Sequence, residues 1–441
     1  MQNAKRGITL IALIITVIIL LILVGTAISI SISGGDLFGR SQNAVAQYNN
    51  RVAEKENKIN EVWSILDNMG PKGPTLPEEW DSTKVASVKE GSITVDGETK
   101  TVKAPIPSGY TASTISPEDE IREGLVIYQG TEAVDANSAT SRNQFVWIPV
   151  PDINSMVMCK SNAEGSICNI KLENGELVCK THSNATGATN MCGRQYGVDS
   201  NTSSSSAPYI YSTSMDFNLR NQTFSDYREP DLVTVYDKDS NTSYMTAAGV
   251  STATELKTQM QDDFYAMAKS VATYGGFYIG RYEAGYNSAN TDTYISQKNK
   301  TVLDATTSSA NKWYGLYSHL RTSMGSLNSQ MIWGCQYDQA IKFIKENSSI
   351  DPEIGHTNIG LKSTPDVSGA EGVNDIQQNI YDLEGNRLEW TEQAYSTNYR
   401  VSRGSGYGRV SISYFRPASD RDRLYPNYTN ADYSSRPGLY L

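Results

Sequence analysis

The C-terminal part of the chain contains side chains suited to binding a ligand. The stretch from Arg403 to Pro437 is rich in Tyr, Ser, Gly, Asn and Arg. Tyrosine offers a large, rigid contact at low entropic cost, and short polar residues around it supply adaptable hydrogen bonds. We therefore predict a ligand-binding face formed by Tyr407, Arg409, Ser411, Tyr414, Arg421, Tyr425, Tyr428, Asn430 and Tyr433.

Cysteine chemistry is concentrated in one polar segment, which contains Cys159, Cys168, Cys179 and Cys192. No two of them form a C-x-x-C pair and the chain has only 3 histidines, so a zinc site is not expected. Outside the membrane two disulfides are the expected outcome, and the sequence leaves their connectivity open. Residues 155–243, rich in Ser, Asn and Thr, are predicted to be a surface insertion stapled by these bonds.

The overall composition suits a folded protein and excludes one class of partner. The chain has 441 residues, of which 39% are hydrophobic and 20% are charged, as in globular proteins. Its formal charge of −10 offers no basic face to phosphates, so nucleic acid is not an expected partner. The 27 tyrosines against 8 phenylalanines favour either an exposed recognition surface or simply a β-rich secreted domain.

A long apolar run near the N-terminus predicts a membrane anchor. Residues 8–24 contain no charge, and their apolar character continues to Ile32. About 20 such residues cross a bilayer as a helix, and the run exceeds the apolar core of a cleaved signal peptide. Because Lys5 and Arg6 keep the short end cytoplasmic, we predict a single-pass protein of the cell membrane, anchored by residues 8–32, with an extracellular C-terminal head.

Behind this anchor the sequence predicts further elements. Apolar residues recur at three- and four-residue steps from Val45 to Leu66, which predicts a stalk helix packed against another chain or against the head. Gly and Pro residues then end it. The expected division is a leader and transmembrane helix at 1–33, a stalk helix at 34–69, a linker and β-rich segment at 70–143, and a head at 144–441.

Within the head, one helix is marked at both ends. Thr252-x-x-Glu255 is a capping box, Gly275 is an expected C-terminal stop, and apolar residues between Leu256 and Val271 share one face. That stripe predicts a core contact rather than a cofactor site. The run at 144–150 predicts a strand, and the alternating run at 277–283 predicts a buried strand.

The N-terminal residues Lys5-Arg6-Gly7-Ile8-Thr9 resemble the start of type IV prepilins. The resemblance implies cleavage between Gly7 and Ile8 by a prepilin peptidase, and contact with pilus subunits. Ala12 stands where that family has a glutamate that assists assembly. A plain membrane tether therefore stays open beside a pilus-associated location.

The head resembles the formylglycine-generating enzyme and sulfatase-modifying-factor superfamily, a variant of the C-type lectin fold. The matching pieces are Phe145–Pro149, Gly276–Glu283, the Gly-Asn-x-x-Glu-Trp-Thr segment that ends at Thr391, Arg403-Gly404-Ser405 and Arg436–Tyr440. The fold class implied is α+β, with an N-terminal transmembrane and stalk helix followed by a C-type lectin-like domain that has a disulfide-containing insertion.

The resemblance has two chemical implications. The copper-binding thiol pair of the enzymes is missing, because no cysteine lies between Arg403 and Asp420; we therefore predict that the chain is not an enzyme. The enzyme branch also implies a calcium site at Gly385, Arg387 and Glu389, and no other cofactor. The alternative is that Gly385 makes a turn, Trp390 fills the core and Glu389 pairs with an arginine.

Lectin-fold proteins diversified by retroelements also resemble this chain, since their variable surface lies in the same C-terminal part. This implies a bacterial cell-surface or pilus-associated protein that binds a protein or glycan ligand outside the cell. The alternatives are an enzyme of the sulfatase-modifying superfamily and a structural pilin-like subunit.

Overall fold

The computed structural model describes residues 52, 53, 55, 58, 76–135, 137–159, 169–181, 185–194, 242–286, 293–303, 312–349, 367–369, 376–394, 399–404, 406, 418, 421–428 and 430–441. The chain divides into two compact units, Met1–Lys72 and Gly73–Leu441. The few described residues of the first unit are helical. All the strands and helices named below belong to the second unit.

The largest sheet has seven strands in the order β15-β16-β23-β11-β5-β4-β3, and every neighbouring pair is antiparallel. Its strands are β3 (Tyr110–Ala112), β4 (Val126–Gln129), β5 (Gln144–Pro149), β11 (Gly276–Gly280), β15 (Thr322–Met324), β16 (Leu327–Met331) and β23 (Pro437–Tyr440). The C-terminal strand therefore lies inside the sheet, between β16 and β11.

The strands β5 and β11 confirm the two strands that the sequence predicts at 144–150 and 277–283. Every residue of both strands is buried, as expected for strands covered on both faces. Gly276 is required where they meet, because a Cβ there would lie 2.4 Å from the carbonyl oxygen of Ile148 and 2.5 Å from the ring of Trp147. The absence of a side chain lets the backbones approach.

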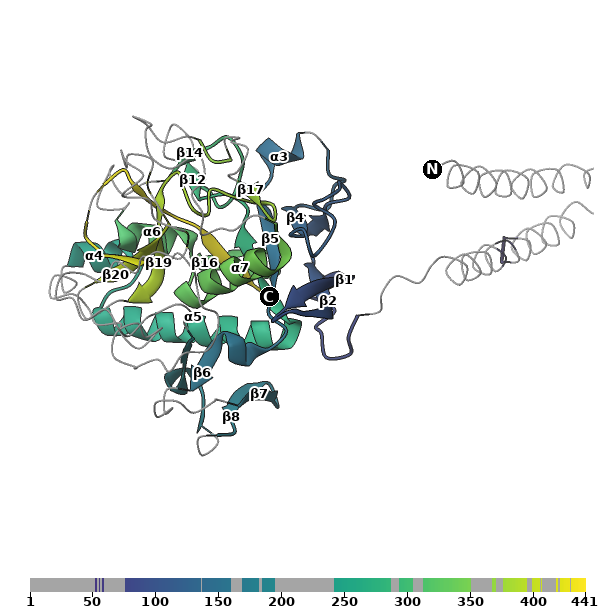
Figure 1. Ribbon diagram of the computed structural model, residues 1–441, viewed down its shortest axis with the longest axis horizontal. Helices are drawn as coiled ribbons and strands as arrows, with labels where there is room; N and C mark the ends of the chain where they lie inside the picture. The colour runs from purple at the N-terminus through teal and green to yellow at the C-terminus, as the bar shows by residue number, and fades with distance from the viewer. Residues whose placement is uncertain are drawn as a thin grey trace, which may run out of the picture. The chain divides into compact units, whose positions relative to one another are not determined.

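The helix α5 (Ala253–Tyr274) packs against β11 and β23 and is the longest helix labelled in Figure 1. Thr252 caps it, since its side chain accepts a hydrogen bond from the Glu255 amide at 3.1 Å. Gly275 ends it in the left-handed conformation, with φ of 76°. The predicted apolar stripe is buried, so the helix, its ends and its core face are confirmed.

A second sheet has the order β21-β20-β19-β22 and contains two of the C-terminal residues predicted to bind, Arg421 and Tyr433. Its strands are β19 (Leu388–Ala394), β20 (Arg400–Arg403), β21 (Arg421–Leu424) and β22 (Tyr433–Ser435). The pair β19 and β22 is parallel, whereas the other two pairs are antiparallel. The helices α6 (Trp313–Leu320) and α7 (Gly334–Asn347) contact β16 and β19 respectively.

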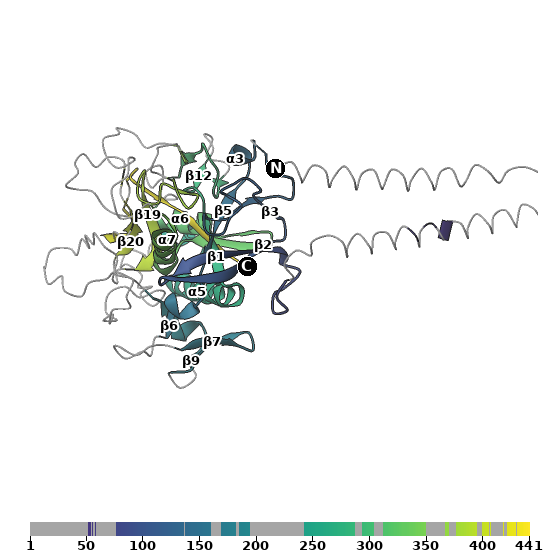
Figure 2. The same ribbon diagram turned by 45° about the vertical axis from the view of Figure 1, so that its right-hand side comes forward.

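A long hairpin, β1 (Val85–Val95) and β2 (Glu98–Pro107), packs against α7, and Figure 2 shows the two side by side. Its tip is Asp96-Gly97, where both residues have positive φ, the sequence signature of a tight hairpin turn. Lys342 of α7 donates to Asp96 at 2.8 Å, which fastens the tip to the helix.

The remaining elements are small. They are β6 (Val157–Cys159) with β10 (Met191–Gly193); β7 (Ile170–Glu173), β8 (Glu176–Cys179) and β9 (Ala185–Thr186); β12 (Gly285–Tyr286), β13 (Thr293–Tyr294) and β14 (Thr301–Val302); β17 (Ile376–Gln377) with β18 (Ile380–Tyr381); and the short helices α3 (Ser138–Ser141), η1 (Ile153–Ser155), η2 (Ala188–Asn190) and α4 (Thr242–Ala247).

The predicted fold class is wrong, because the described residues form many strands and few helices rather than an α+β fold led by a transmembrane and stalk helix. Within the described ranges, no helix is both long and apolar enough to cross a bilayer. The prediction of a single-pass membrane protein with an extracellular head is therefore not upheld. Gly7, Ile8, the apolar run at 8–32 and nearly all of 34–69 lie outside the described residues.

The predicted linker and β-rich segment at 70–143 contributes strands to the main sheet. Its strands β3 and β4 extend that sheet from β5. The compact unit accordingly begins at Gly73.

Candidate functional site

Arg436 and Glu389 form a fully buried ion pair at the junction of the two sheets. Arg436 Nη2 lies 2.7 Å from Glu389 Oε1, and Nε donates to both carboxylate oxygens at 2.9 and 3.1 Å. The other N–H groups donate to the carbonyl oxygens of Gly280 at 2.8 Å and Tyr381 at 2.6 Å. Because the guanidinium is satisfied on several sides, its charge can be buried, and it joins β11, β18, β19 and β23.

Glu283 is a second buried carboxylate beside this pair. Its Oε1 accepts from Ser434 Oγ at 2.7 Å and its Oε2 from Asn386 Nδ2 at 2.6 Å. Burial, helped by the negative charge of Glu389, raises the pKa of Glu283 to about 8. At neutral pH Glu283 is therefore mostly protonated, so these two carboxyls and Arg436 together have no net charge.

Asp338 on α7 forms a third buried charge cluster. Its Oδ2 lies 2.6 Å from Arg421 Nη2, and its Oδ1 pairs with Arg403 Nη2. The ring of Tyr337 packs against the Arg403 guanidinium, with its centroid 4.8 Å away. These ion pairs join α7 to β20 and β21, which fixes the strands next to the predicted binding face.

Glu389 has the partner that the calcium-free alternative requires, an arginine. Trp390 is fully buried, as that alternative also requires. The turn before β19 differs from that alternative, because Asn386 rather than Gly385 has a positive φ, of 60°. Arg387 donates to the carbonyl oxygen of Ala431. Over the described part of the chain, no group of three or more acidic, histidine or cysteine side chains is placed to hold a metal.

Among the described residues after Arg403, the exposed ones are Tyr425 and Tyr428, which lie in a turn made of Tyr425, Pro426, Asn427 and Tyr428. It follows β21 directly, and the Tyr428 amide donates to the Tyr425 carbonyl oxygen at 2.8 Å. This bond is the mark of a closed β-turn, which brings the first and fourth residues within about 7 Å. The Trp313 amide donates to the Pro426 carbonyl oxygen at 3.2 Å, so the turn is also attached to α6.

Both tyrosines of this turn are exposed, and each ring packs against another tyrosine. Tyr425 is 38% exposed and Tyr428 is 40% exposed. The Tyr399 ring lies 4.5 Å from the Tyr425 ring, and the Tyr399 hydroxyl donates to the Tyr425 hydroxyl at 2.9 Å. Tyr428 packs edge-on against Tyr433 at 5.8 Å, and Tyr433 in turn lies 5.3 Å from Trp390. We call Tyr399, Tyr425 and Tyr428 the tyrosine face.

The predicted binding residues therefore have different environments. Arg421 and Tyr433 are buried, which corrects their assignment to the ligand-contacting surface: Arg421 pairs with Asp338, and Tyr433 supports Tyr428. Asn430 is half-buried and accepts the Asp432 amide at 3.1 Å. Tyr407, Arg409, Ser411 and Tyr414 lie outside the described residues. Sequence reasoning missed Tyr399, whose only signal is its place immediately before the Arg403 element.

The register of β6 and β10 bears on which of the predicted cysteines can form a disulfide with one another. Cys159 lies opposite Met191, and Cys192 lies opposite Met158. Opposed residues share a face and neighbours alternate, so Cys159 and Cys192 point to opposite faces of the pair, which disfavours a bond between them. Cys179 is buried and Cys168 lies outside the described residues, so the two disulfides stay a prediction.

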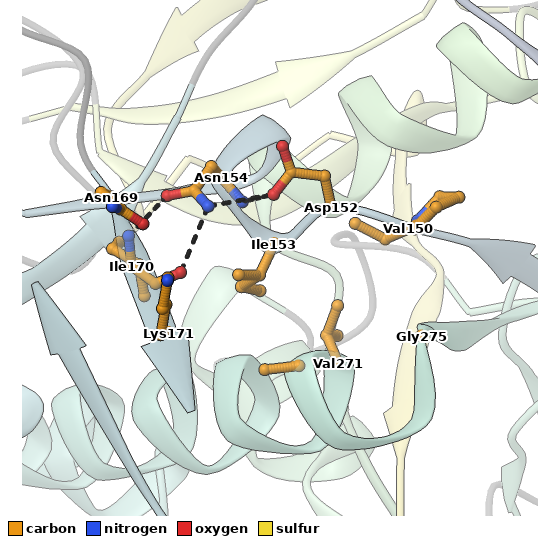
Figure 3. A pocket seen from close by; sticks show the side chains of 11 residues that line it. Val150, Asp152, Ile153, Asn154, Asn169, Ile170, Lys171, Val271 and Gly275 are labelled. Carbon is orange, nitrogen blue, oxygen red and sulfur yellow. Dashed lines mark hydrogen bonds between the residues drawn. The ribbon is translucent and has the colours of Figure 1, made fainter. Parts of the chain in front are cut away.

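A separate cavity of about 300 Å³ lies between the end of β5, η1, the start of β7 and the last turn of α5. Figure 3 shows Ile153 and Val271 at its apolar floor. Asp152, Asn154, Asn169 and Lys171 add polar groups to its wall.

Comparisons with known proteins identify no family. No family model matches the chain, and no curated protein matches it. Among solved structures, Treponema denticola variable protein 1 matches with a TM-score of 0.24 and 10% identity, over 72% of this chain and 99% of that chain. A likeness this loose supports no argument about fold or function. The expected place in the sulfatase-modifying-factor superfamily, which no family model supports, is corrected accordingly.

Proposed function

We propose that this chain is a binding protein that takes a protein or glycan ligand on the tyrosine face. The observation that supports this most directly is the closed turn that exposes Tyr425 and Tyr428, whose rings pack against half-buried Tyr399 and buried Tyr433. Ordering flexible side chains is a main cost of association, so rings that are already held in place bind at lower cost. Tyrosine is also among the residues that contribute most to interfaces.

The surroundings of the face suit adaptable recognition. Asn427, between the two tyrosines in the sequence, and Asn430 are both half-buried. An amide side chain has both donors and an acceptor; Asn430 already bonds to Asp432 through its oxygen and its nitrogen. The rings give contact area, while the amides can match hydrogen-bonding groups on a ligand. This combination serves a polar protein surface or a sugar.

We propose binding rather than catalysis. A pKa near neutrality is what a catalytic acid or base needs, and burial raises the pKa of Glu283 to about 8. Its carboxyl is nevertheless fully buried and hydrogen-bonded to Ser434 and Asn386. Its neighbour Glu389 is engaged by Arg436. Both groups stabilise strand connections, and neither lines the cavity beside α5 or the one between the β1–β2 hairpin and α7.

The proposal extends to genetic variation of the face. Exposed positions such as Tyr425 and Tyr428 can change at little cost, typically about 0.5 kcal/mol or less, whereas Arg421 and Arg436 cannot. Near the gene we expect an imperfect copy of the coding segment for 403–436, differing at adenines, beside a reverse transcriptase gene. Differences that fall on the buried arginines rather than on the turn would contradict this extension.

The experiment is a capture assay with the full chain on a glycan array and on an array of purified surface proteins. The unchanged protein should give specific signals, and the double variant Tyr425→Ala/Tyr428→Ala should lose them. Tyr265→Ala is the matched control, because Tyr265 is a half-exposed tyrosine on α5, away from the face. Equal capture by the double variant, or no specific capture by the unchanged protein on either array, would contradict the proposed function.

A further inference from the structure

The cavity beside α5 is built from three segments of the chain, 150–154, 169–171 and 271–275. Asn154 holds two of them together: its Oδ1 accepts the Ile170 amide at 2.7 Å, and its Nδ2 donates to the Ile170 carbonyl oxygen at 3.2 Å. A side chain that pairs with a backbone in this way fixes η1 against β7. The cavity wall is therefore ordered before any ligand arrives, as is usual for small-molecule sites.

Its floor is apolar. Val150, Ile170 and Val271 are buried, and Ile153 and Ala272 are half-buried. With a volume of about 300 Å³, the cavity is at the small end of the range for ligand sites. It therefore suits a compact molecule with an aliphatic part rather than a polymer.

The lining contains one acidic and one basic residue, Asp152 and Lys171, and both are exposed. Figure 3 shows them on opposite sides of Ile153. Asp152 uses Oδ1 to accept the amide and the side-chain nitrogen of Asn154 at 2.9 and 3.0 Å. In the described part of the chain, neither charge forms an ion pair with the other or with a third residue.

We propose that this cavity binds a free amino acid with an aliphatic side chain. The ammonium group of the ligand would lie toward Asp152 and its carboxylate toward Lys171, while the side chain covers Ile153 and Val271. A zwitterion matches a lining that has both charges and no net charge, whereas a simple cation or anion would meet one repulsive group. The inference does not depend on the tyrosine face.

The test is calorimetric titration of the full chain with three probes: L-leucine, 3-methylbutylamine and 4-methylpentanoate. The second lacks the carboxylate of leucine and the third lacks its amine. We expect saturable binding of leucine and at least about tenfold weaker binding of each single-charge probe. No saturable leucine binding, or equal binding of either analogue, would overturn the proposal.

Variants locate the site. Asp152→Asn keeps an oxygen that can accept the Asn154 bonds and removes the charge, and Lys171→Gln removes the opposite charge; each should weaken leucine binding at least about fivefold. Ala272→Leu should fill the floor and abolish binding. Asp135→Asn is the matched control, since Asp135 also accepts local amide bonds through Oδ1 and does not line this cavity. Leucine binding that survives Asp152→Asn and Ala272→Leu would place the ligand elsewhere and overturn the assignment.

Discussion

The buried charges behind the C-terminal strands and the tyrosine turn next to them differ in how many neighbours fix each side chain. Arg436 bonds to three strands, and Asp338 holds two arginines from different strands. Tyr425 and Tyr428, by contrast, leave more than a third of their surface to solvent. Substituting a residue of the buried ion pairs leaves a buried charge without its partner, whereas substituting Tyr425 or Tyr428 removes only exposed surface. The two regions therefore separate stability from recognition within one short stretch of chain.

The largest expected effect comes from breaking the buried pair. Glu389→Gln leaves Arg436 charged and without its counter-ion, which should cost about 3 to 5 kcal/mol of unfolding free energy. Urea denaturation measures it. The control Glu176→Gln breaks an ion pair with Lys269 of similar length, 3.0 Å, at the surface and should cost less than about 1 kcal/mol. Similar losses for both variants would show that burial does not distinguish the two pairs.

Next in size is a pH effect from Glu283. Its pKa is raised from 4.5 to about 8 on folding, so the folded protein holds a proton that the unfolded chain has lost. This contribution is complete below pH 4.5 and disappears as the pH rises through 8, at up to about 1.4 kcal/mol per pH unit. Glu283→Gln, which imitates the protonated form, should flatten this loss in melts from pH 5 to pH 9. A pH dependence that Glu283→Gln leaves unchanged would contradict a protonated Glu283 beside the ion pair of Glu389 and Arg436.

A smaller effect is expected from Tyr399→Phe. The change removes the hydroxyl that donates to Tyr425 but keeps the ring contact, so unfolding free energy should fall by about 1 kcal/mol or less. Capture of an array ligand should weaken only a few-fold, because the Tyr425 ring loses one of its supports. A larger loss of stability than of binding would move Tyr399 from the face to the buried framework.

The smallest expected effect is that of a chelator. Since Glu389 is engaged by Arg436 rather than available to a cation, an excess of EGTA should leave the melting temperature unchanged. A lower melting temperature that added calcium restores would revive the calcium site at Gly385, Arg387 and Glu389.

Local signals in the sequence predicted local structure well. The capping box at Thr252, the stop at Gly275 and the stripe between them need only neighbours within one helix, and all three are confirmed. The hydrophobic runs of β5 and β11 also predicted strands, because both faces of these strands are covered and nearly every position is therefore apolar. Pairings between distant segments, such as β3 and β4 with β5, had no comparable local signal.

The candidate site could be predicted only in part, because composition does not reveal the direction of a side chain. Tyr425 and Tyr428 are exposed as the binding prediction requires, whereas Arg421 points inward. Its partner Asp338 lies 83 positions earlier, and no local pattern marks that pairing. The same long-range contact explains why an arginine in a Tyr- and Ser-rich stretch can be structural.

We infer that the tyrosine face carries binding and the buried ion pairs carry stability. The most direct test of this division measures binding and stability in the same samples. For the strongest array ligand, Tyr425→Ala/Tyr428→Ala should weaken binding by at least about 30-fold, the loss of one strong interface contact, while unfolding free energy changes by about 1 kcal/mol or less. Glu389→Gln should show the opposite at a temperature where it is still folded: reduced stability with nearly normal binding. Retained binding in the tyrosine variant, or a loss that merely follows unfolding, would contradict the account.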